Sequence, residues 1–256
     1  MIDNVERVPI SRVSEKGKDS AVDFVVTELP LTIMLNSREL VTLLCSPANL
    51  EYLAIGFLFS EGLIESKDDI SQIRVDAGGN VVRVGTKKDI RFSSPPLSQR
   101  LVTSGGGRGT TFYHPQARVE SDIKISVGEA FALRDEFVQR SALFKATDSV
   151  HSAALCDTKN ILVFSEDIGK HNAIDKVFGE CLLKDIPTGG RLVITSGLVS
   201  SEILLKVAKR DVPLLISKSA PTNMGVRLAN DLGVTLVGFA QGKKAKIYTN
   251  EWRVVA

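Results

Sequence analysis

The second half of the chain alternates short apolar segments with segments of helical periodicity, and this alternation narrows the folds that it can adopt. The apolar segments that predict strands are residues 161–164, 192–195, 212–217 and 234–240. The segments that predict helices lie between them, at residues 172–183, 201–210 and 224–232. Strands that alternate with helices in this way form βαβ units. The sequence therefore predicts an α/β domain with a mainly parallel sheet.

The first half is predicted to be richer in strands. Segments 21–35 and 39–45 are rich in Val, Leu, Ile and Thr, and the break at residues 36–38 predicts a hairpin. Residues 70–75 and 81–85 predict a second pair of strands. These segments indicate a smaller, strand-rich α+β region beside the α/β domain.

Two further helices are predicted outside the alternating half. Ser46 would be the N-cap of the first, Pro47 its first helical residue, and Gly62 its end. Helical periodicity returns at residues 127–144.

Residues 93–118 show no regular pattern, and they contain a glycine-rich run at residues 103–111. A long segment without secondary structure in a compact protein is usually functional. The run is not a P-loop, because no Lys-Ser or Lys-Thr follows the glycines at the required offset. We predict three parts: a strand-rich segment with one helix at 1–92, a glycine-rich functional loop at 93–126, and a cofactor-binding α/β domain at 127–256. The first and last parts could pack as one unit.

Composition and charge argue against several functional classes. The formal net charge of the 256 residues is +2, whereas nucleic-acid-binding proteins usually carry a strongly basic face. No apolar stretch approaches the roughly 18 residues that a membrane-spanning helix needs. The charged N-terminus lacks a hydrophobic signal core. We therefore expect a cytoplasmic protein that binds neither nucleic acid nor membranes.

The cysteines are dispersed along the chain. Cys45, Cys156 and Cys181 have no C-x-x-C spacing, which argues against a disulfide framework and against a zinc site of that type. Cys156 and Cys181 lie in apolar segments, as core thiols do. Cys45 precedes a predicted helix N-terminus, the only context here that could lower a thiol pKa, but a structural role is favoured for it too. The histidines are equally dispersed, so no metal site is expected.

Polar residues are concentrated just after the strand predicted at 161–164. Four of them stand in the turn that opens the next helix: Asp167, Lys170, His171 and Asn172. A turn that only reverses the chain needs Gly, Asn or Asp, but not a histidine between charges of both signs. Capping residues and solvated charges are the alternative explanation. Because open α/β sheets bind ligands at the carboxyl ends of their strands, a functional site is favoured.

The other predicted strands are also followed by polar loops. These loops are Ser196-Gly197, residues 217–222 and residues 241–244. Right-handed crossovers bring such loops to one edge of the sheet. Helix N-termini, Ser or Thr hydroxyls and Lys side chains are groups that bind phosphate. The four loops together predict a phosphorylated or nucleotide ligand, and His151 could be either an anion partner or a near-core residue.

Five segments of the chain together resemble the FdhD family of formate dehydrogenase accessory proteins, also called sulfur carrier or sulfurtransferase proteins. The segments are residues 46–58 with Glu61-Gly62, 166–176, 196–202, 217–222 and 237–240. They occur in order along nearly the whole chain, so their combined specificity is high.

The resemblance implies a function, partners and a fold. Members of this family take sulfur from a cysteine desulfurase. They deliver it to the molybdenum or tungsten bis-pterin guanine dinucleotide cofactor before that cofactor enters formate dehydrogenase. The resemblance also implies a cytidine deaminase-like α/β domain with a parallel-containing sheet, and a homodimer.

The motifs and the strand-end loops together give a set of expected site residues. Asp167 and His171 would shape a polar catalytic site, and Lys243 and Lys244 would neutralise charge on the cofactor. Hydroxyls expected to meet phosphates belong to Ser200, Ser201 and Thr222. The other residues expected to bind the cofactor are Lys170, Asn172, Ser196, Gly197, Ser219, Phe239, Ala240, Gln241 and Gly242.

The sequence departs from the family pattern at the residue that matters most for sulfur transfer. The family's persulfide-bearing cysteine corresponds to Gly106, and a second cysteine would fall at Gly109. Sulfur transfer requires a thiolate nucleophile, which glycine cannot supply. Lys170 and Lys218 also replace the family's usual arginines, which keeps the charge but removes bidentate phosphate recognition.

Two other functions remain open at this point. A chaperone that only carries the cofactor, without sulfurtransferase activity, would explain the missing loop cysteine. A zinc deaminase is conceivable from the implied fold. It is disfavoured because His151 is followed neither by a Glu two positions later nor by a later P-C-x-x-C.

Overall fold

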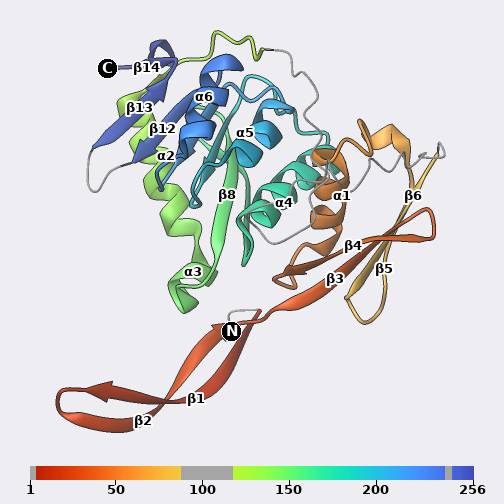
Figure 1. Cartoon of the computed structure of the whole chain (residues 1–256), viewed down its shortest axis with the longest axis vertical. Coiled ribbons are helices and arrows are strands. Elements are labelled where there is room, and N and C mark those ends of the chain that lie inside the picture. The colour runs from red at the N-terminus through yellow and green to blue at the C-terminus, as the bar shows by residue number, and fades with distance from the viewer. Residues whose placement is uncertain (1–3, 88–117, 240–243) are drawn as a thin grey trace.

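The larger part of the protein is a six-stranded mixed sheet between two layers of helices (Figure 1). The computed structural model describes residues 4–87, 118–239 and 244–256. The sheet has the order β13-β12-β11-β10-β8-β9. Its strands are β8 (His151–Cys156), β9 (Ile161–Asp167), β10 (Leu192–Thr195), β11 (Leu214–Ser217), β12 (Thr235–Phe239) and β13 (Ala245–Thr249).

The predicted α/β class is confirmed, but the sheet is less parallel than expected. β10, β11 and β12 are parallel neighbours. β8 lies antiparallel between β9 and β10, and β13 is antiparallel to β12. β8 and β9 are joined by the short connection at 157–160, and a connection this short can only join antiparallel strands. The alternating pattern did not reveal β8 or β13.

Three helices cover one face of this sheet, and α2 covers the other. Helices α4 (Lys170–Leu183), α5 (Ser201–Ala208) and α6 (Asn223–Asp231) each lead from one strand to the next parallel strand. Their buried side chains share one core with one face of the sheet. Helix α2 (Val127–Arg140) packs on the other face through Ala130, Leu133 and Phe137.

The helix expected at 127–144 is interrupted. It ends at Arg140 and restarts as α3 (Ala142–Thr147). At the interruption the Ser141 hydroxyl donates to the Phe137 carbonyl and hydrogen-bonds the Ser152 hydroxyl. The Glu166 carboxylate accepts from the amides of Leu143 and Phe144, at 3.1 Å each, and so caps α3 from the neighbouring strand. Tertiary contacts therefore start a new helix where the periodicity continued.

A second sheet of four strands lies beside the first, in the order β4-β3-β6-β5. Its strands are β3 (Leu29–Leu35), β4 (Arg38–Cys45), β5 (Ile70–Val75) and β6 (Val81–Thr86), as the two predicted hairpins require. Helix α1 (Leu50–Ser60) packs between this sheet and α4. The described ranges also contain two short helical turns (Lys67–Asp69 and Glu251–Arg253) and the parallel pair β7 (Ile125–Ser126) and β14 (Val254–Val255). The three-part division at 93–126 stays a prediction.

Helix α1 begins later than predicted. Its N-cap is Asn49, with φ 55°, rather than Ser46. The Ser46 amide instead donates to the buried carboxylate of Asp167, so it is held by a tertiary contact. The predicted end at Gly62 is confirmed, with φ +72° and a Leu63 amide that donates to the Leu58 carbonyl at 2.9 Å.

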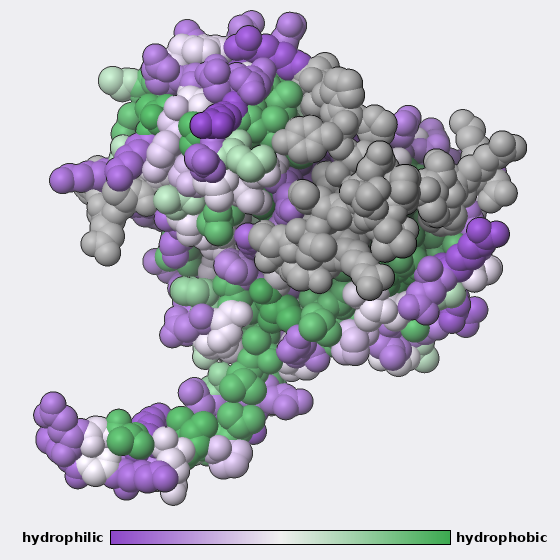
Figure 2. Space-filling model, viewed as in Figure 1, coloured by the Kyte–Doolittle hydropathy of each residue, from purple (hydrophilic) through white to green (hydrophobic). Residues whose placement is uncertain are grey.

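The segment expected at 21–35 is not continuous either. It is divided between β3 and the preceding strand β2 (Gly17–Val26), which pairs with β1 (Val5–Ser14). This β1–β2 ribbon projects from the body of the molecule (Figure 1), and none of its residues is buried. It carries apolar and hydrophilic residues side by side (Figure 2).

Candidate functional site

Three of the four loops predicted to meet at one edge of the large sheet, those after β9, β10 and β11, do meet there. β9, β10, β11 and β12 run in the same direction, so their carboxyl ends lie at one edge together with the amino end of β8. The N-termini of α4, α5 and α6 lie at the same edge, because each helix follows one of these strands. Helix N-termini carry partial positive charge and free amide donors. We call this edge the strand-end site.

Hydrogen bonds join the loops that follow β10 and β11. The Ser217 hydroxyl donates to the Gly197 carbonyl at 2.8 Å, and the Ser219 hydroxyl donates to the Ser196 carbonyl at 2.9 Å. Val199 and Pro221 form an isolated parallel bridge further along the two loops. The two loops therefore form one rigid unit, and Ser217 is a component that the sequence analysis did not single out.

Two of the predicted phosphate-binding hydroxyls are helix caps. The Ser200 hydroxyl oxygen accepts from the Ile203 amide at 3.5 Å at the start of α5. The Thr222 hydroxyl oxygen accepts from the Gly225 amide at 3.0 Å at the start of α6. Because each oxygen is an acceptor in these contacts, each hydroxyl keeps its proton to donate. Ser201, in the first turn of α5, is half-buried.

Asp167 and Asn172 are buried beneath the turn that opens α4. Asp167 is 0% exposed, and one carboxylate oxygen accepts from the Gly169 amide at 2.8 Å and from the Asn172 amide group at 2.9 Å. The other oxygen accepts from the Ser46 amide at 3.1 Å. Lys176, also 0% exposed, places its ammonium 2.6 Å from the same oxygen. Asp167 therefore fixes the shape of the turn from below.

The turn presents Lys170 to the site. Gly197 is packed so closely that a Cβ there would lie 3.0 Å from the Lys170 Cβ and 3.6 Å from the His151 Nδ1. His151 is half-buried, and its Nδ1 lies 3.4 Å from the Ser196 hydroxyl oxygen. Burial, and then the nearby Lys170 ammonium, lower the His151 pKa. A neutral imidazole from the start of β8, an ammonium from the start of α4 and a hydroxyl from the loop after β10 thus come together.

His171 points toward α5. Its Nε2 lies 3.4 Å from a carboxylate oxygen of Glu202, and only 17% of its side chain is exposed. Burial, with smaller contributions from Lys206 and Lys170, lowers the His171 pKa to about 3. The imidazole is therefore neutral at physiological pH, so its contact with Glu202 is not an ion pair. Glu202 was not predicted, because its position in an amphipathic helix does not distinguish it from a surface charge.

The other predicted site residues lie beside the carboxyl end of β12 or outside the described residues. Phe239 ends β12, and Lys244 is exposed just before β13. The predictions for Gly106, Ala240, Gln241, Gly242 and Lys243 concern residues outside the described ranges. Within those ranges, no helix is both long and apolar enough to cross a membrane, and no group of three or more His, Cys, Asp or Glu side chains is placed to hold a metal ion.

A comparison with protein-family models decides which family this architecture represents. Residues 26–255 match the model of the FdhD/NarQ family. The chain belongs to the FdhD/NarQ family. The resemblance inferred from the motifs is thereby confirmed.

Individual relatives within the FdhD/NarQ family agree with this assignment. The "Sulfur carrier protein FdhD" of Bacillus pumilus is 41% identical over 91% of this chain and 90% of its own length. The protein of the same name from Bacillus subtilis is 40% identical, over 94% of each chain. A crystal structure of a putative formate dehydrogenase accessory protein from Desulfotalea psychrophila superposes with a TM-score of 0.82 and 25% identity, over 98% of this chain and 99% of that one.

This member of the FdhD/NarQ family has no exposed thiol. All three of its cysteines are free and buried. Burial, and then the negative charge of Asp167, raise the pKa of Cys45 to about 12. Burial also raises the pKa of Cys181 to about 12 and that of Cys156 further still. The structural role expected for all three cysteines agrees with these surroundings, and the lowered pKa considered for Cys45 does not occur.

Proposed function

We propose that this protein binds a molybdenum or tungsten bis-pterin guanine dinucleotide and supports the maturation of a formate dehydrogenase. The observation that carries the proposal is the meeting of three polar loops and three helix N-termini at the strand-end site. Pyrophosphate groups require amide donors, hydroxyls and ammonium groups in one place. Lys170, Ser196, Ser219 and Lys218 supply such groups there. The names of the relatives, formate dehydrogenase accessory protein and sulfur carrier protein, support the same biological role.

The residues at this site have distinct parts in binding. Lys170 and the amino ends of α5 and α6 would neutralise and hold phosphates. His151 and His171, neutral at physiological pH, would exchange hydrogen bonds without adding charge. Asp167 would act as a positioning residue, because it touches the turn and not the solvent-facing side of the site. The homodimer implied by the family resemblance belongs to this proposal as well.

GDP is the fragment of the cofactor that tests this proposal. Isothermal titration is expected to show binding of GDP to the folded protein, and Lys170→Met should weaken it on the order of tenfold, since a charge-assisted hydrogen bond is lost. Lys159→Met is the control, because Lys159 lies in the β8–β9 connection at the opposite edge of the sheet. Absence of binding at millimolar GDP would count decisively against the proposal.

The buried cysteines favour a second form of the function, in which the protein carries the cofactor without holding sulfur itself. A persulfide forms when a thiolate attacks the terminal sulfur of the persulfide on a cysteine desulfurase. The chain has three cysteines, all buried with a raised thiol pKa, and a glycine at position 106. We infer that this protein acts as a cofactor-binding chaperone, and that any sulfur delivered by a desulfurase goes to the cofactor by way of another thiol.

A persulfide assay separates the two forms. Incubation with a cysteine desulfurase and cysteine is expected to leave the folded protein without added sulfur in intact-mass spectra. Gly106→Cys restores a thiol at the family position and should acquire a sulfur atom under the same conditions. A persulfide on Cys45, Cys156 or Cys181 of the unaltered folded protein would contradict the chaperone role and favour the sulfurtransferase function.

A further inference from the structure

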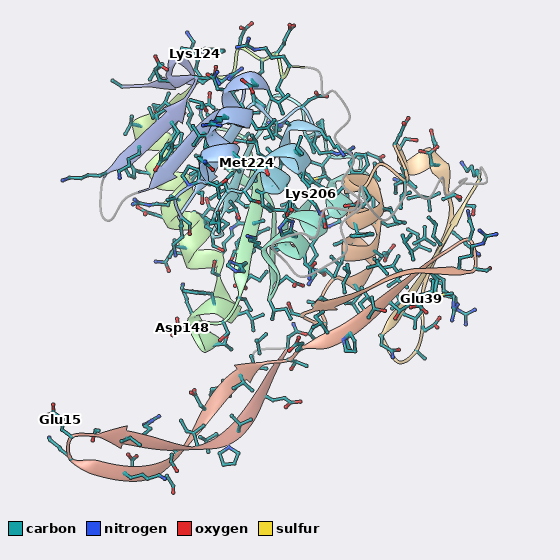
Figure 3. The ribbon with its side chains drawn as sticks, in the orientation of Figure 1. Glu15, Glu39, Lys124, Asp148, Lys206 and Met224 are labelled. Atoms are coloured by element: carbon teal, nitrogen blue, oxygen red, sulfur yellow. The ribbon has the colours of Figure 1, made fainter. Side chains whose placement is uncertain are left out.

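Polar side chains from α4 and α5 face one another in two pairs where these helices meet beside the strand-end site. His171 on α4 faces Glu202 on α5. One turn further along each helix, Asp175 faces Lys206, which is labelled in Figure 3. The Lys206 ammonium contacts both carboxylate oxygens of Asp175, at 2.7 and 2.5 Å, and the Ser60 hydroxyl donates to the same carboxylate at 2.6 Å. The second pair is therefore a complete, buried ion pair.

The first pair is formed by two atoms that solvent does not reach. The His171 Nε2 lies 3.4 Å from a carboxylate oxygen of Glu202, and both atoms are buried. No other described residue offers Nε2 a hydrogen bond. Glu202 is 8% exposed, and a buried carboxylate needs donors nearby because its charge is costly without them. The imidazole nitrogen that faces it is a donor that the fold places there.

The chemistry of the carboxylate decides where the proton of this imidazole lies. A carboxylate can only accept hydrogen bonds, and a neutral imidazole carries one proton, on either Nδ1 or Nε2. With the proton on Nδ1, the lone pair of Nε2 would meet a negatively charged oxygen in a buried place. With the proton on Nε2, the same contact is attractive. The partner of one ring nitrogen in this way sets the state of the other nitrogen.

We infer that Glu202 is a positioning residue that holds the proton of His171 on Nε2, so that Nδ1 is left as a hydrogen-bond acceptor of the strand-end site. Because Nε2 is buried, the 17% of the His171 side chain that is exposed belongs to its other atoms. A group that this nitrogen receives must be a donor, such as an O–H or N–H group. The role of Nδ1 toward a ligand rests on the proposed function, whereas the position of the proton does not.

The charges around the ring keep it from taking a second proton. Burial is the largest effect that lowers the His171 pKa, and the ammonium groups of Lys206 and Lys170 follow. His151, at the start of β8, has a smaller effect of the same sign. Glu202 is the opposing group, since a negative charge favours imidazolium. With a pKa of about 3, the ring is neutral near pH 7, so Glu202 selects the nitrogen that carries its single proton.

The NMR shifts of the ring nitrogens test this assignment, because protonated and bare imidazole nitrogens resonate far apart. The signals of His171 are assigned by their loss in His171→Gln. In the folded, unaltered protein at neutral pH, Nε2 is expected in the protonated range and Nδ1 in the bare range. The reverse result, with the proton on Nδ1, would overturn the inference whether or not the protein binds GDP.

Three further variants separate positioning from a merely structural role. Glu202→Leu removes the acceptor, so the proton is expected to leave Nε2 for Nδ1, since a buried donor without an acceptor is costly. Glu202→Gln keeps an oxygen that can accept and should keep the proton on Nε2. Glu180→Leu is the control on α4, where Glu180 pairs with Lys184, and it should leave both nitrogens of His171 unchanged. Unchanged ring nitrogens in Glu202→Leu would overturn the role of Glu202.

Titration with GDP measures the consequence for binding. Glu202→Leu should bind GDP on the order of tenfold more weakly than the unaltered protein, because an acceptor at the site is replaced by a donor. Glu202→Gln should bind GDP nearly as tightly as the unaltered protein. Unweakened binding by Glu202→Leu, with its proton displaced, would overturn the role of Nδ1 toward a ligand. No binding by the unaltered protein would overturn the proposed function, and the NMR shifts would still decide the position of the proton.

Discussion

Lys176→Met is expected to lower the free energy of unfolding by about 3–5 kcal/mol. Lys176 and Asp167 are both fully buried, and the ammonium nitrogen lies 2.6 Å from a carboxylate oxygen. The same ammonium donates to the carbonyls of Ser46 and Glu166. The variant leaves a buried carboxylate without its counter-charge and two carbonyls without a donor, which costs more than the ion pair itself contributes. Denaturant unfolding at equilibrium measures the loss.

Lys184→Met, at the C-cap of the same helix, is the matched control. Lys184 pairs with Glu180 at 2.6 Å, but 53% of its side chain is exposed, so its loss should change stability far less than the loss of Lys176 does. The double variant Asp167→Asn with Lys176→Met should recover part of the stability, since it leaves no unpaired charge. Equal decreases in the free energy of unfolding for Lys176→Met and Lys184→Met would contradict the full burial of the Asp167–Lys176 ion pair.

Gly179→Ala is expected to lower the free energy of unfolding by about 3 kcal/mol. A methyl group at Gly179 would overlap the Tyr52 carbonyl on α1, and one at Gly56 would overlap the Asp175 carbonyl on α4. These obstacles are backbone atoms of the opposite helix, so no rotamer change relieves them and the helices must separate. In a helix without such an obstacle, Ala is more favourable than Gly by about 1 kcal/mol. A loss of stability in Gly179→Ala would therefore be due to the close crossing of the two helices. Thermal or denaturant unfolding measures it.

Gly128→Ala provides the comparison. Gly128 lies in the first turn of α2, and a Cβ there would meet its nearest neighbour, the Ser126 hydroxyl oxygen, at 3.9 Å. The substitution should therefore leave stability unchanged or raise it by up to about 1 kcal/mol. A Gly179→Ala protein as stable as Gly128→Ala would contradict the tight packing of α1 on α4.

The buried ion pair of Asp167 with Lys176 and the close crossing of α1 and α4 connect the fold to the proposed function. The close crossing of α1 and α4 brings the end of β4 beneath the turn that opens α4, where the Ser46 amide reaches Asp167. Asp167 then holds the turn that presents Lys170 at the strand-end site. Variants that loosen the crossing or the ion pair, yet remain folded, should also bind GDP more weakly. The site thus depends on residues that do not touch its ligand.

Much of the larger domain could be predicted from local patterns. The strand at Leu192–Thr195 has the predicted bounds. The predicted first residues of the helices that follow Ser200 and Thr222 were correct to within a residue or two. The alternation of strands and helices also placed the polar loops at one edge of the sheet. The interruption at Ser141 and the late start of α1 were missed, because both depend on side chains from other elements.

The sequence by itself determined the family, the α/β class, the gathering of polar loops and the absence of a loop cysteine at Gly106, since each is written in local composition or order. Only the tertiary structure decided that β8 enters the sheet antiparallel, that Asp167 and Lys176 are buried, and that His171 faces Glu202. The physical reason is that burial and strand order depend on contacts between distant segments. Asp167 is buried because its partners include the Ser46 amide, 121 residues away along the chain, and no local pattern encodes such a contact.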